Sequence, residues 1–294
     1  MRLSEIPLYE GERLLSDGEF EKFGLLSNKT SGNILSFLDS PKFLQETENK
    51  CITCIFCREQ FVSLLPKHIN GVIISEQPNI SFWRRHNEMQ KPRKKFETRI
   101  GENCNISSMA CIAPNNVIIG NNVVIEEFVS VKENVVIGNN CIVRAGSVIG
   151  SQGFEFKNMI DESLFPVEHF GGVILEDNVE LQALTHVARA VMPEDDTIIG
   201  SGSKTDAMVH IAHAVKIGRN CRIAAGAVFS GSVCTGDNVW IGPNATVSNG
   251  LSIDGGARIS LGSVVTQDVE AGKTVSGNFA IDHRKQIEFI KSIC

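Results

Sequence analysis

The stretch VHIAHAVKI at residues 209–217 decides the fold, because it is part of a repeat with a period of six residues. From Leu175 to Val265 a mostly apolar residue recurs at every sixth position, and a small residue often follows four positions later. The repeating positions are Leu175, Leu181, Val187, Pro193, Ile199, Thr205, Ile211, Ile217, Ile223, Phe229, Thr235, Ile241, Val247, Ile253, Ile259 and Val265. A period of six fits neither an amphipathic helix nor an alternating strand.

This period is typical of a parallel β-helix of hexapeptides, in which each short strand contributes one apolar residue to a shared interior. Three such hexapeptide units, or hexads, close one coil, so that positions three hexads apart stack on the same face. The pattern begins at Ile100, slips by one residue between Ile112 and Ile119, and continues to Ile149. We therefore predict about eight coils and a prism roughly 40 Å long, because stacked strands lie about 4.8 Å apart.

The chain divides where the sixfold pattern begins. Residues 1–97 alternate strand-like apolar runs with helical segments, which indicates a small α/β domain. Residues 98–269 form the predicted β-helix, interrupted by a loop at 150–172 that we expect to contact a substrate or a neighbouring subunit. Residues 270–294 form a tail with one short helix. The predicted fold class is mainly β, with a small N-terminal α/β domain and a short C-terminal helix.

Composition argues against several classes of function. The net charge of −6 and the lack of a long basic run disfavour nucleic-acid binding. No stretch is apolar over the roughly 18 residues that a membrane span requires. The N-terminus also lacks the apolar segment of a signal peptide, so we expect a cytoplasmic protein. Cys51, Cys54 and Cys57 lie close together, but a zinc site would need a fourth ligand, and we interpret them as part of an apolar strand.

Several short motifs, taken in order, carry a resemblance to a known family. They are LSFL and PKF in the first domain, GFEF in the loop, DTIIG and the run from Lys204 to His213 in the repeat, and Gly277-Asn278 with His283-Arg284 near the end. With these motifs the chain resembles the UDP-3-O-acylglucosamine N-acyltransferases of lipid A synthesis over nearly its whole length. The resemblance implies a left-handed parallel β-helix and a homotrimer with active sites between subunits, although parallel crossovers are generally right-handed.

The resemblance also implies that the first domain binds the uracil-type base of a nucleotide sugar. Phe37 and Phe43 stand in the places of the family's stacking aromatics, and such rings can stack on a flat base. From the residues alone, both would be interpreted as core. Ser40 stands where the family usually has Asn, and Phe43 where it usually has Tyr, so selectivity between uracil and thymine stays open. The loop residues that we expect to contact the substrate are Phe154, Phe156 and His169.

His213 matches the family's catalytic histidine, and we assign it as the general base. Acyl transfer to an amine requires a group that accepts a proton near neutral pH, which histidine does well. Asp206 matches an Asp of the same motif and could orient the imidazole. One coil further on, three hexads after His213, lies Gly231. A glycine there would let a thioester approach the backbone, whose N–H could stabilise the oxyanion.

Some departures from the family bear on the acyl donor. Leu251 stands where the family often has a second histidine, and the tail is shorter than the family's helical extension that binds acyl carrier protein. The final coil, residues 261–269, resembles instead the ending of acetyl-CoA-dependent sugar N-acetyltransferases, which places Gly262 and Ser263 with Gly231 at the donor.

These departures favour one function over another. The favoured function is transfer of a short acyl group from acyl-CoA to the amine of a UDP- or dTDP-linked amino sugar, for a surface glycan such as lipopolysaccharide or O-antigen. The alternative is an acyl carrier protein-dependent UDP-3-O-acylglucosamine N-acyltransferase of lipid A synthesis. Either thioester acts as a co-substrate, and no bound cofactor is expected.

Two other classes of function remain open. Metal-dependent carbonic anhydrases use the same prism and bind zinc through histidines, for which His186, His210 and His213 are the candidates. His186 and His210 are four hexads apart, which predicts two different faces and disfavours a metal site. The other class is a non-catalytic scaffold or sugar-binding module, which would not need His213 for acyl transfer.

Overall fold

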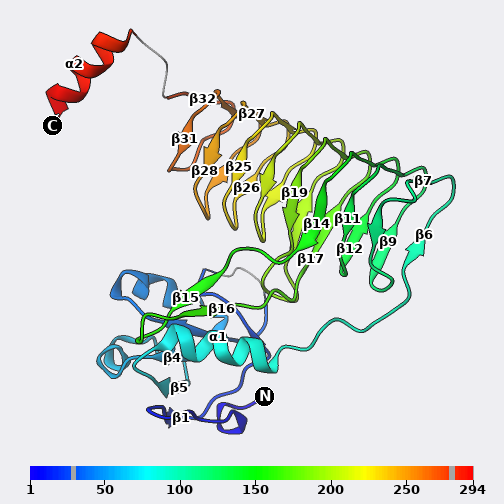
Figure 1. Cartoon of the computed structure of the whole chain (residues 1–294). Helices are drawn as coiled ribbons and strands as arrows, with labels where there is room; N and C mark the ends of the chain where they lie inside the picture. The colour runs from blue at the N-terminus through cyan, green and yellow to red at the C-terminus, as the bar shows by residue number, and fades with distance from the viewer. Residues whose placement is uncertain (28–30, 278–281, 294) are drawn as a thin grey trace. The chain divides into compact units, whose positions relative to one another are not determined.

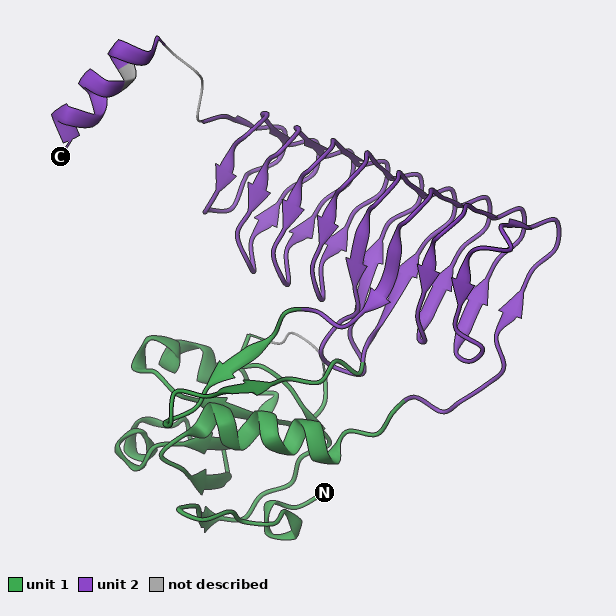
Figure 2. Cartoon of the chain, viewed as in Figure 1, with its two compact units in different colours: residues 1–92, 154–170 green, residues 93–153, 171–294 purple. Residues whose placement is uncertain are grey.

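The computed structural model describes residues 1–27, 31–277 and 282–293. Asn278, which carries part of the resemblance, lies outside these ranges. The chain forms two compact units (Figure 2). Unit 1 comprises residues 1–92 and 154–170, and unit 2 comprises residues 93–153 and 171–294. Most of the loop that we had assigned to the β-helix domain therefore belongs to unit 1.

Unit 2 contains the predicted parallel β-helix, whose coils stack in register along three faces (Figure 1). In the described part of the chain the first face has nine strands, and the second and third have eight each. The first face consists of β7 (Asn105–Ile106), β10 (Val124–Ile125), β13 (Ile142–Val143), β18 (Glu180–Leu181), β21 (Lys204–Thr205), β24 (Arg222–Ile223), β27 (Trp240–Ile241), β30 (Arg258–Ile259) and β32 (Thr274–Val275). The second face consists of β8 (Cys111–Ile112), β11 (Ser130–Val131), β14 (Val148–Ser151), β19 (His186–Ala188), β22 (His210–Ile211), β25 (Val228–Phe229), β28 (Thr246–Val247) and β31 (Val264–Val265). The third face consists of β6 (Arg99–Ile100), β9 (Val117–Ile119), β12 (Val135–Ile137), β17 (Gly172–Leu175), β20 (Asp196–Ile199), β23 (Lys216–Ile217), β26 (Cys234–Thr235) and β29 (Ser252–Ile253).

The repeating residues fill the interior as the sixfold pattern predicts, and we call each inward-pointing repeating residue a rung. Ile211, Phe229 and Val247 are fully buried and stack three hexads apart on consecutive strands of the second face. Burying such a column removes apolar surface from water at each rung, which stabilises the stack cooperatively.

One repeating position was assigned wrongly. Pro193 lies in a turn between β19 and β20 and contributes no rung, while Val275 in β32 adds one that the sequence pattern did not include. The buried residues Val187 and Ile199 are rungs of consecutive strands but lie two hexads apart instead of one. The chain therefore contains a six-residue insertion at the corner between the second and third faces. Because the insertion is one whole period long, it leaves the sixfold pattern of the sequence unchanged and could not be detected from that pattern.

Unit 1 is an α/β domain with one five-stranded sheet. The strand order is β1-β5-β4-β3-β2, in which only β1 is antiparallel to its described neighbour. Helix α1 packs on β3 and β4. The elements are η1 (Leu3–Glu5), β1 (Arg13–Ser16), β2 (Lys22–Phe23), β3 (Ile34–Leu38), η2 (Pro41–Glu48), β4 (Ile52–Cys57), η3 (Glu59–Leu64), β5 (Gly71–Ile74), α1 (Pro78–Met89), β15 (Phe156–Asn158) and β16 (Leu164–Pro166).

The hairpin of β15 and β16 packs on α1 within unit 1. His86 donates from Nε2 to the carbonyl of Glu168 over 3.0 Å, and Asn87 donates to the carbonyl of Pro166 over 2.9 Å. The ammonium of Lys157 lies 5.1 Å from the centroid of the Trp83 ring. The loop was expected to contact a substrate or a neighbouring subunit. Within unit 1 the hairpin packs on α1, and the expected contact of the loop with a substrate or a neighbouring subunit stays a prediction.

The predicted short C-terminal helix is present as α2 (His283–Ile293). Its apolar side chains Ile287, Phe289, Ile290 and Ile293 are exposed. Within the described ranges, neither α2 nor any other helix combines the length and the apolar character needed to cross a bilayer.

Candidate functional site

His213 lies two residues beyond β22, at the corner between the second and third faces. Its imidazole covers Gly231 of the next coil: a Cβ atom added to Gly231 would lie 2.4 Å from both Cε1 and Nε2. The backbone holds this arrangement, since Ser232 donates its N–H to the carbonyl of His213 over 2.9 Å. The predicted stacking of these two residues, one coil apart, is therefore present.

Gly231 offers a backbone donor beside this imidazole. Its carbonyl accepts the N–H of Gly250 over 2.9 Å. Its own N–H has no hydrogen-bond partner among the residues that the structure describes. The corner thus brings together an imidazole and a free peptide N–H, and the imidazole occupies the space that a side chain at residue 231 would need.

Asp206 lies at a different corner of the same coil. It directly follows β21, so it stands between the first and second faces, whereas His213 stands at the far end of β22. The Asp206 side chain is exposed, and its Oδ1 accepts the N–H of Ala207 over 2.7 Å. Its role in orienting His213 stays a prediction, and it would require a neighbouring subunit.

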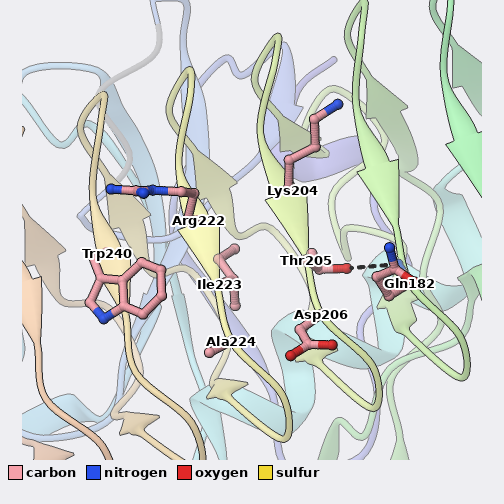
Figure 3. A pocket seen from close by; sticks show the side chains of 8 residues that line it. All are labelled: Gln182, Lys204, Thr205, Asp206, Arg222, Ile223, Ala224 and Trp240. Atoms are coloured by element: carbon pink, nitrogen blue, oxygen red, sulfur yellow. Dashed lines mark hydrogen bonds between the residues drawn. The ribbon is translucent and has the colours of Figure 1, made fainter.

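A pocket of about 270 Å³ opens on the first face beside Asp206 (Figure 3). Its floor is formed by consecutive strands, whose outward side chains stack from coil to coil. The guanidinium of Arg222 lies 5.2 Å from the centroid of the Trp240 ring, and that of Arg258 lies 5.6 Å from it. The lining residues are Gln182, Lys204, Thr205, Asp206, Arg222, Ile223, Ala224 and Trp240.

His186 and His210 were predicted to lie on different faces, and this is wrong. The six-residue insertion makes their coil four hexads long, so β19 pairs directly with β22 and the two histidines are partners in register. Their rings are stacked, with centroids 5.0 Å apart, and the two Nδ1 atoms are 3.1 Å apart. Nε2 of His186 lies 2.6 Å from the hydroxyl of Ser151. Burial lowers the pKa of both histidines, which favours a neutral hydrogen-bonded chain over two imidazolium ions.

The cysteine cluster lies on or beside a buried strand. Cys54 and Cys57 are in β4 and fully buried, and burial raises the pKa of their thiols to about 11 and about 12. Thiols of this kind pack as small apolar side chains. Among the described residues, no three His, Cys, Asp or Glu side chains come together in a group that could hold a metal ion.

The residues predicted to bind the base lie near the carboxyl end of β3. Phe37 is half-buried and packs against Phe82 and Trp83 of α1, with ring centroids 5.1 and 6.3 Å away. Phe43 in η2 is 37% exposed, and the ammonium of Lys42 lies 4.5 Å from its ring centroid. Ser40 precedes η2 and its side chain makes no capping hydrogen bond. Phe43 is thus the more exposed of the two rings, and base stacking on either ring stays a prediction.

The loop and donor residues differ in accessibility. Phe154 is 89% exposed, and its ring meets that of Phe156 edge to face at 5.1 Å. His169 is only 4% exposed and donates from Nδ1 to the carbonyl of Val167, which indicates a packing role. Gly262 adopts a left-handed conformation with open space around it.

The side chain of Ser263 does not face the solvent, as it would have to do to contact the acyl donor. It is 3% exposed and stacks in register on the fully buried Ala245, so its side chain turns toward the core. A contact of its side chain with the acyl donor, as predicted for this residue, is therefore not supported. The position follows the rule that a small residue recurs four places after each rung.

Other functional candidates were missed in the sequence. The pair of His186 and His210 escaped notice because the insertion misassigned their faces. The stack of Arg222, Trp240 and Arg258 could have been found, since these residues follow one another at intervals of three hexads.

Two family models match the helix. The model described as bacterial transferase hexapeptide (six repeats) matches residues 116–151 and 196–231, and that described as hexapeptide repeat of succinyl-transferase matches residues 97–127. Among solved structures, UDP-N-acetylglucosamine acyltransferase from Campylobacter jejuni aligns with a TM-score of 0.54 at 19% identity, over 67% of this chain and 79% of that one. This likeness concerns the fold alone. The predicted fold class, with its left-handed β-helix of hexapeptide repeats, is confirmed.

Curated relatives carry a consistent name. The UDP-3-O-acylglucosamine N-acyltransferase of Helicobacter pylori is 28% identical over 70% of this chain and 67% of its own length. That of Campylobacter lari is 32% identical over 70% of both chains. The chain is therefore an acyltransferase, and it belongs to the UDP-3-O-acylglucosamine N-acyltransferase family.

Proposed function

We propose that the protein transfers an acyl group from a thioester to the amine of a UDP-linked amino sugar, with His213 as the general base. The observation that carries this proposal is the corner where the His213 imidazole covers Gly231 and its free N–H. The relatives' name supports N-acyl transfer as the reaction and a UDP-linked amino sugar as the acceptor. We accordingly place UDP-3-O-acylglucosamine, the relatives' named substrate, ahead of other amino sugars.

The chemistry needs one proton acceptor and one oxyanion donor. The amine attacks the thioester carbonyl carbon as its proton passes to Nε2 or Nδ1 of His213, which forms the C–N bond and a tetrahedral oxyanion. The N–H of Gly231 stabilises that oxyanion, and the C–S bond then breaks. The leaving thiolate takes the proton back from the imidazolium, so charges and protons balance. A positioned base typically contributes about 10²–10⁴-fold, and one oxyanion donor about 10²–10³-fold.

Asp206 can take part only if subunits associate, because it lies at another corner of its own coil. We propose a homotrimer in which Asp206 of one subunit faces His213 of the next. Mixing D206N and H213A chains tests this arrangement. In randomly mixed trimers about a quarter of the interfaces would combine an intact histidine with an intact aspartate, so activity would reappear. No recovery on mixing two separately inactive variants would contradict a site shared between neighbouring subunits.

Two candidate functions differ in the acyl donor that the protein would use. An acyl carrier protein thioester fits the relatives' name, whereas Leu251 and the final coil at 261–269 favour a short acyl-CoA. Mass spectrometry of products distinguishes them when CoA esters and carrier-protein thioesters of several chain lengths are offered with UDP- and dTDP-amino sugars.

The assignment of His213 is tested in the same assay. H213A should lose most of its turnover with every donor, while H68A, which changes a histidine of unit 1, should keep it. Full activity in H213A would overturn the base assignment, whereas a parent protein that turns over none of these donors would favour a binding module.

A further inference from the structure

A row of cations follows the first face of the β-helix. Lys204, Arg222 and Arg258 occupy matching outward positions, with Trp240 between the two arginines, and every neighbouring pair is in register. Adjacent strands lie about 4.8 Å apart, so the row extends roughly 14 Å along the helix axis. We call these four residues the cationic strip.

The two arginines of the strip lack carboxylate partners. Among the described residues, neither Arg222 nor Arg258 forms an ion pair, and their recorded contact is with the indole of Trp240. Arg144, on the same face, pairs with Glu126 and Glu180 at 2.7 and 2.9 Å. Asp206 lines the same pocket as Lys204 and Arg222, and Glu180 is the in-register neighbour of Lys204, yet among the described residues no carboxylate forms an ion pair with either arginine of the strip.

Trp240 holds the strip in a fixed form. A guanidinium over each side of the indole gains a cation–π interaction, and it is kept from folding back into solvent. Figure 3 shows Arg222 extending toward the coil of Trp240, with Lys204 and Asp206 on the preceding coil. A preformed row of guanidinium groups suits phosphate, because each can donate two parallel hydrogen bonds to its oxygens.

We propose that the cationic strip binds the phosphate end of the acyl donor's pantetheine arm. The inference rests on the proposed function, because it takes a pantetheine thioester as the donor and uses the proposed trimer to bring His213 of a neighbouring subunit to Asp206. The strip begins in the coil of Asp206 and continues over three more coils toward the C-terminus. A pantetheine thioester has its reacting carbon at one end and its phosphate at the other, so it matches a row that leads away from a reacting centre. The phosphate is shared by CoA and by the prosthetic group of a carrier protein.

Trp240 supplies a direct binding signal that needs no turnover. The protein would be titrated with CoA, with phosphopantetheine, with pantetheine, with a phosphopantetheinylated carrier protein, and with UDP, while tryptophan emission is followed. We expect emission to change with the phosphate-bearing pantetheine compounds and not with pantetheine. The signal should vanish in W240F, which identifies it as that of Trp240 and not of Trp83.

Variants of the strip then measure the contribution of each cation. R222A and R258A should weaken donor binding about tenfold each, as expected for a hydrogen bond to a charged group. They should raise the KM for the donor while kcat and the KM for the sugar nucleotide stay within about twofold. R219A is the matched control, because Arg219 pairs with Asp237 at 2.8 Å on another part of the helix.

The outcomes separate sources and hypotheses. A response to CoA identifies the free coenzyme as a source of the phosphate, and a response to the carrier protein alone identifies the protein-bound arm. Equal binding of pantetheine, unchanged affinity in both R222A and R258A, or a response confined to UDP would overturn the inference. H213A should keep the binding signal, so a protein that binds donors but acylates no amino sugar would refute the proposed function and not the strip.

Discussion

His213 and Gly231 lie on adjacent coils in van der Waals contact, and there is no room for a methyl group between them. A Cβ at Gly231 would lie 2.4 Å from Cε1 and Nε2 of the imidazole, so any side chain there must displace the ring. We predict that G231A lowers kcat by about 10²-fold, since a displacement near 1 Å has costs of that order.

The control for this prediction is G255A. A Cβ at Gly255 would meet its nearest atoms at 3.4 and 3.7 Å, which is ordinary contact. Both variants should keep a thermal transition within a few degrees of the parent protein, and steady-state kinetics should separate them. Equal kcat values in G231A and G255A would mean that the position of His213 is unimportant for turnover.

Acid should destabilise the protein through the His186–His210 pair. Burial lowers the pKa of both groups in the folded state, so the unfolded chain binds more protons once pH falls below about 6.5. The stability that comes from keeping them neutral is therefore present above that pH and is lost as pH falls toward their folded pKa values. Thermal transitions between pH 7 and pH 5 should fall less steeply in H186Q/H210Q than in the parent. A parent-like slope in the double variant would contradict this, and H68Q serves as the control histidine.

The cysteines should divide into two reactivity classes. The thiols of Cys54 and Cys57, with pKa values raised to about 11 and about 12, present almost no thiolate at pH 8. Cys111 and Cys234 are exposed and should be alkylated first. Peptide mapping after a timed alkylation would check this order. Rapid labelling of Cys54 in the native protein would show that β4 is less well packed than it is here.

Removing one partner of the buried ion pair of unit 1 should destabilise the protein strongly. The side chains of Arg85 and Glu12 are 1% and 5% exposed, and Glu12 also accepts from Ser81 over 2.6 Å. E12Q leaves the arginine buried without its counter-charge, which typically costs about 3–5 kcal/mol. Urea denaturation followed by Trp83 emission would measure the loss in the intact chain.

An exposed pair provides the comparison for E12Q. Arg13 and Glu59 form an ion pair at 2.7 Å with side chains 54% and 73% exposed. E59Q should therefore cost less than about 1 kcal/mol. Similar losses in the two variants would show that burial adds nothing to the Glu12 interaction.

Wherever coils are regular, the sequence alone was enough to place side chains. A spacing of three hexads correctly stacked His213 on Gly231, and the same spacing relates Arg222, Trp240 and Arg258. It failed for His186 and His210, because the intervening coil carries one extra hexad. The hexad period predicts which residues point into the interior. It does not predict on which of the three faces a given residue lies.

Other parts of the site depend on interactions that a period cannot encode. Asp206 and His213 lie at two corners of one coil, so a pairing between them depends on a second subunit. The packing of the half-buried Phe37 ring on α1 could not be predicted either, since helix packing in unit 1 is a tertiary property, and its stacking role stays a prediction. The burial of Ser263 follows from its phase and could have been deduced.

The two excursions at the corner of His213 have opposite consequences for how such a chain can change over evolutionary time. The segment between Ile149 and Leu175 shifts the later rungs out of phase by two positions. Its gain or loss therefore required the later strands to take up a new register in the coils. The insertion around Pro193 adds one whole period, so its gain or loss leaves each later rung pointing inward. A single in-frame event of that length could add or remove a surface loop beside His213 and leave the phase of every later strand unchanged.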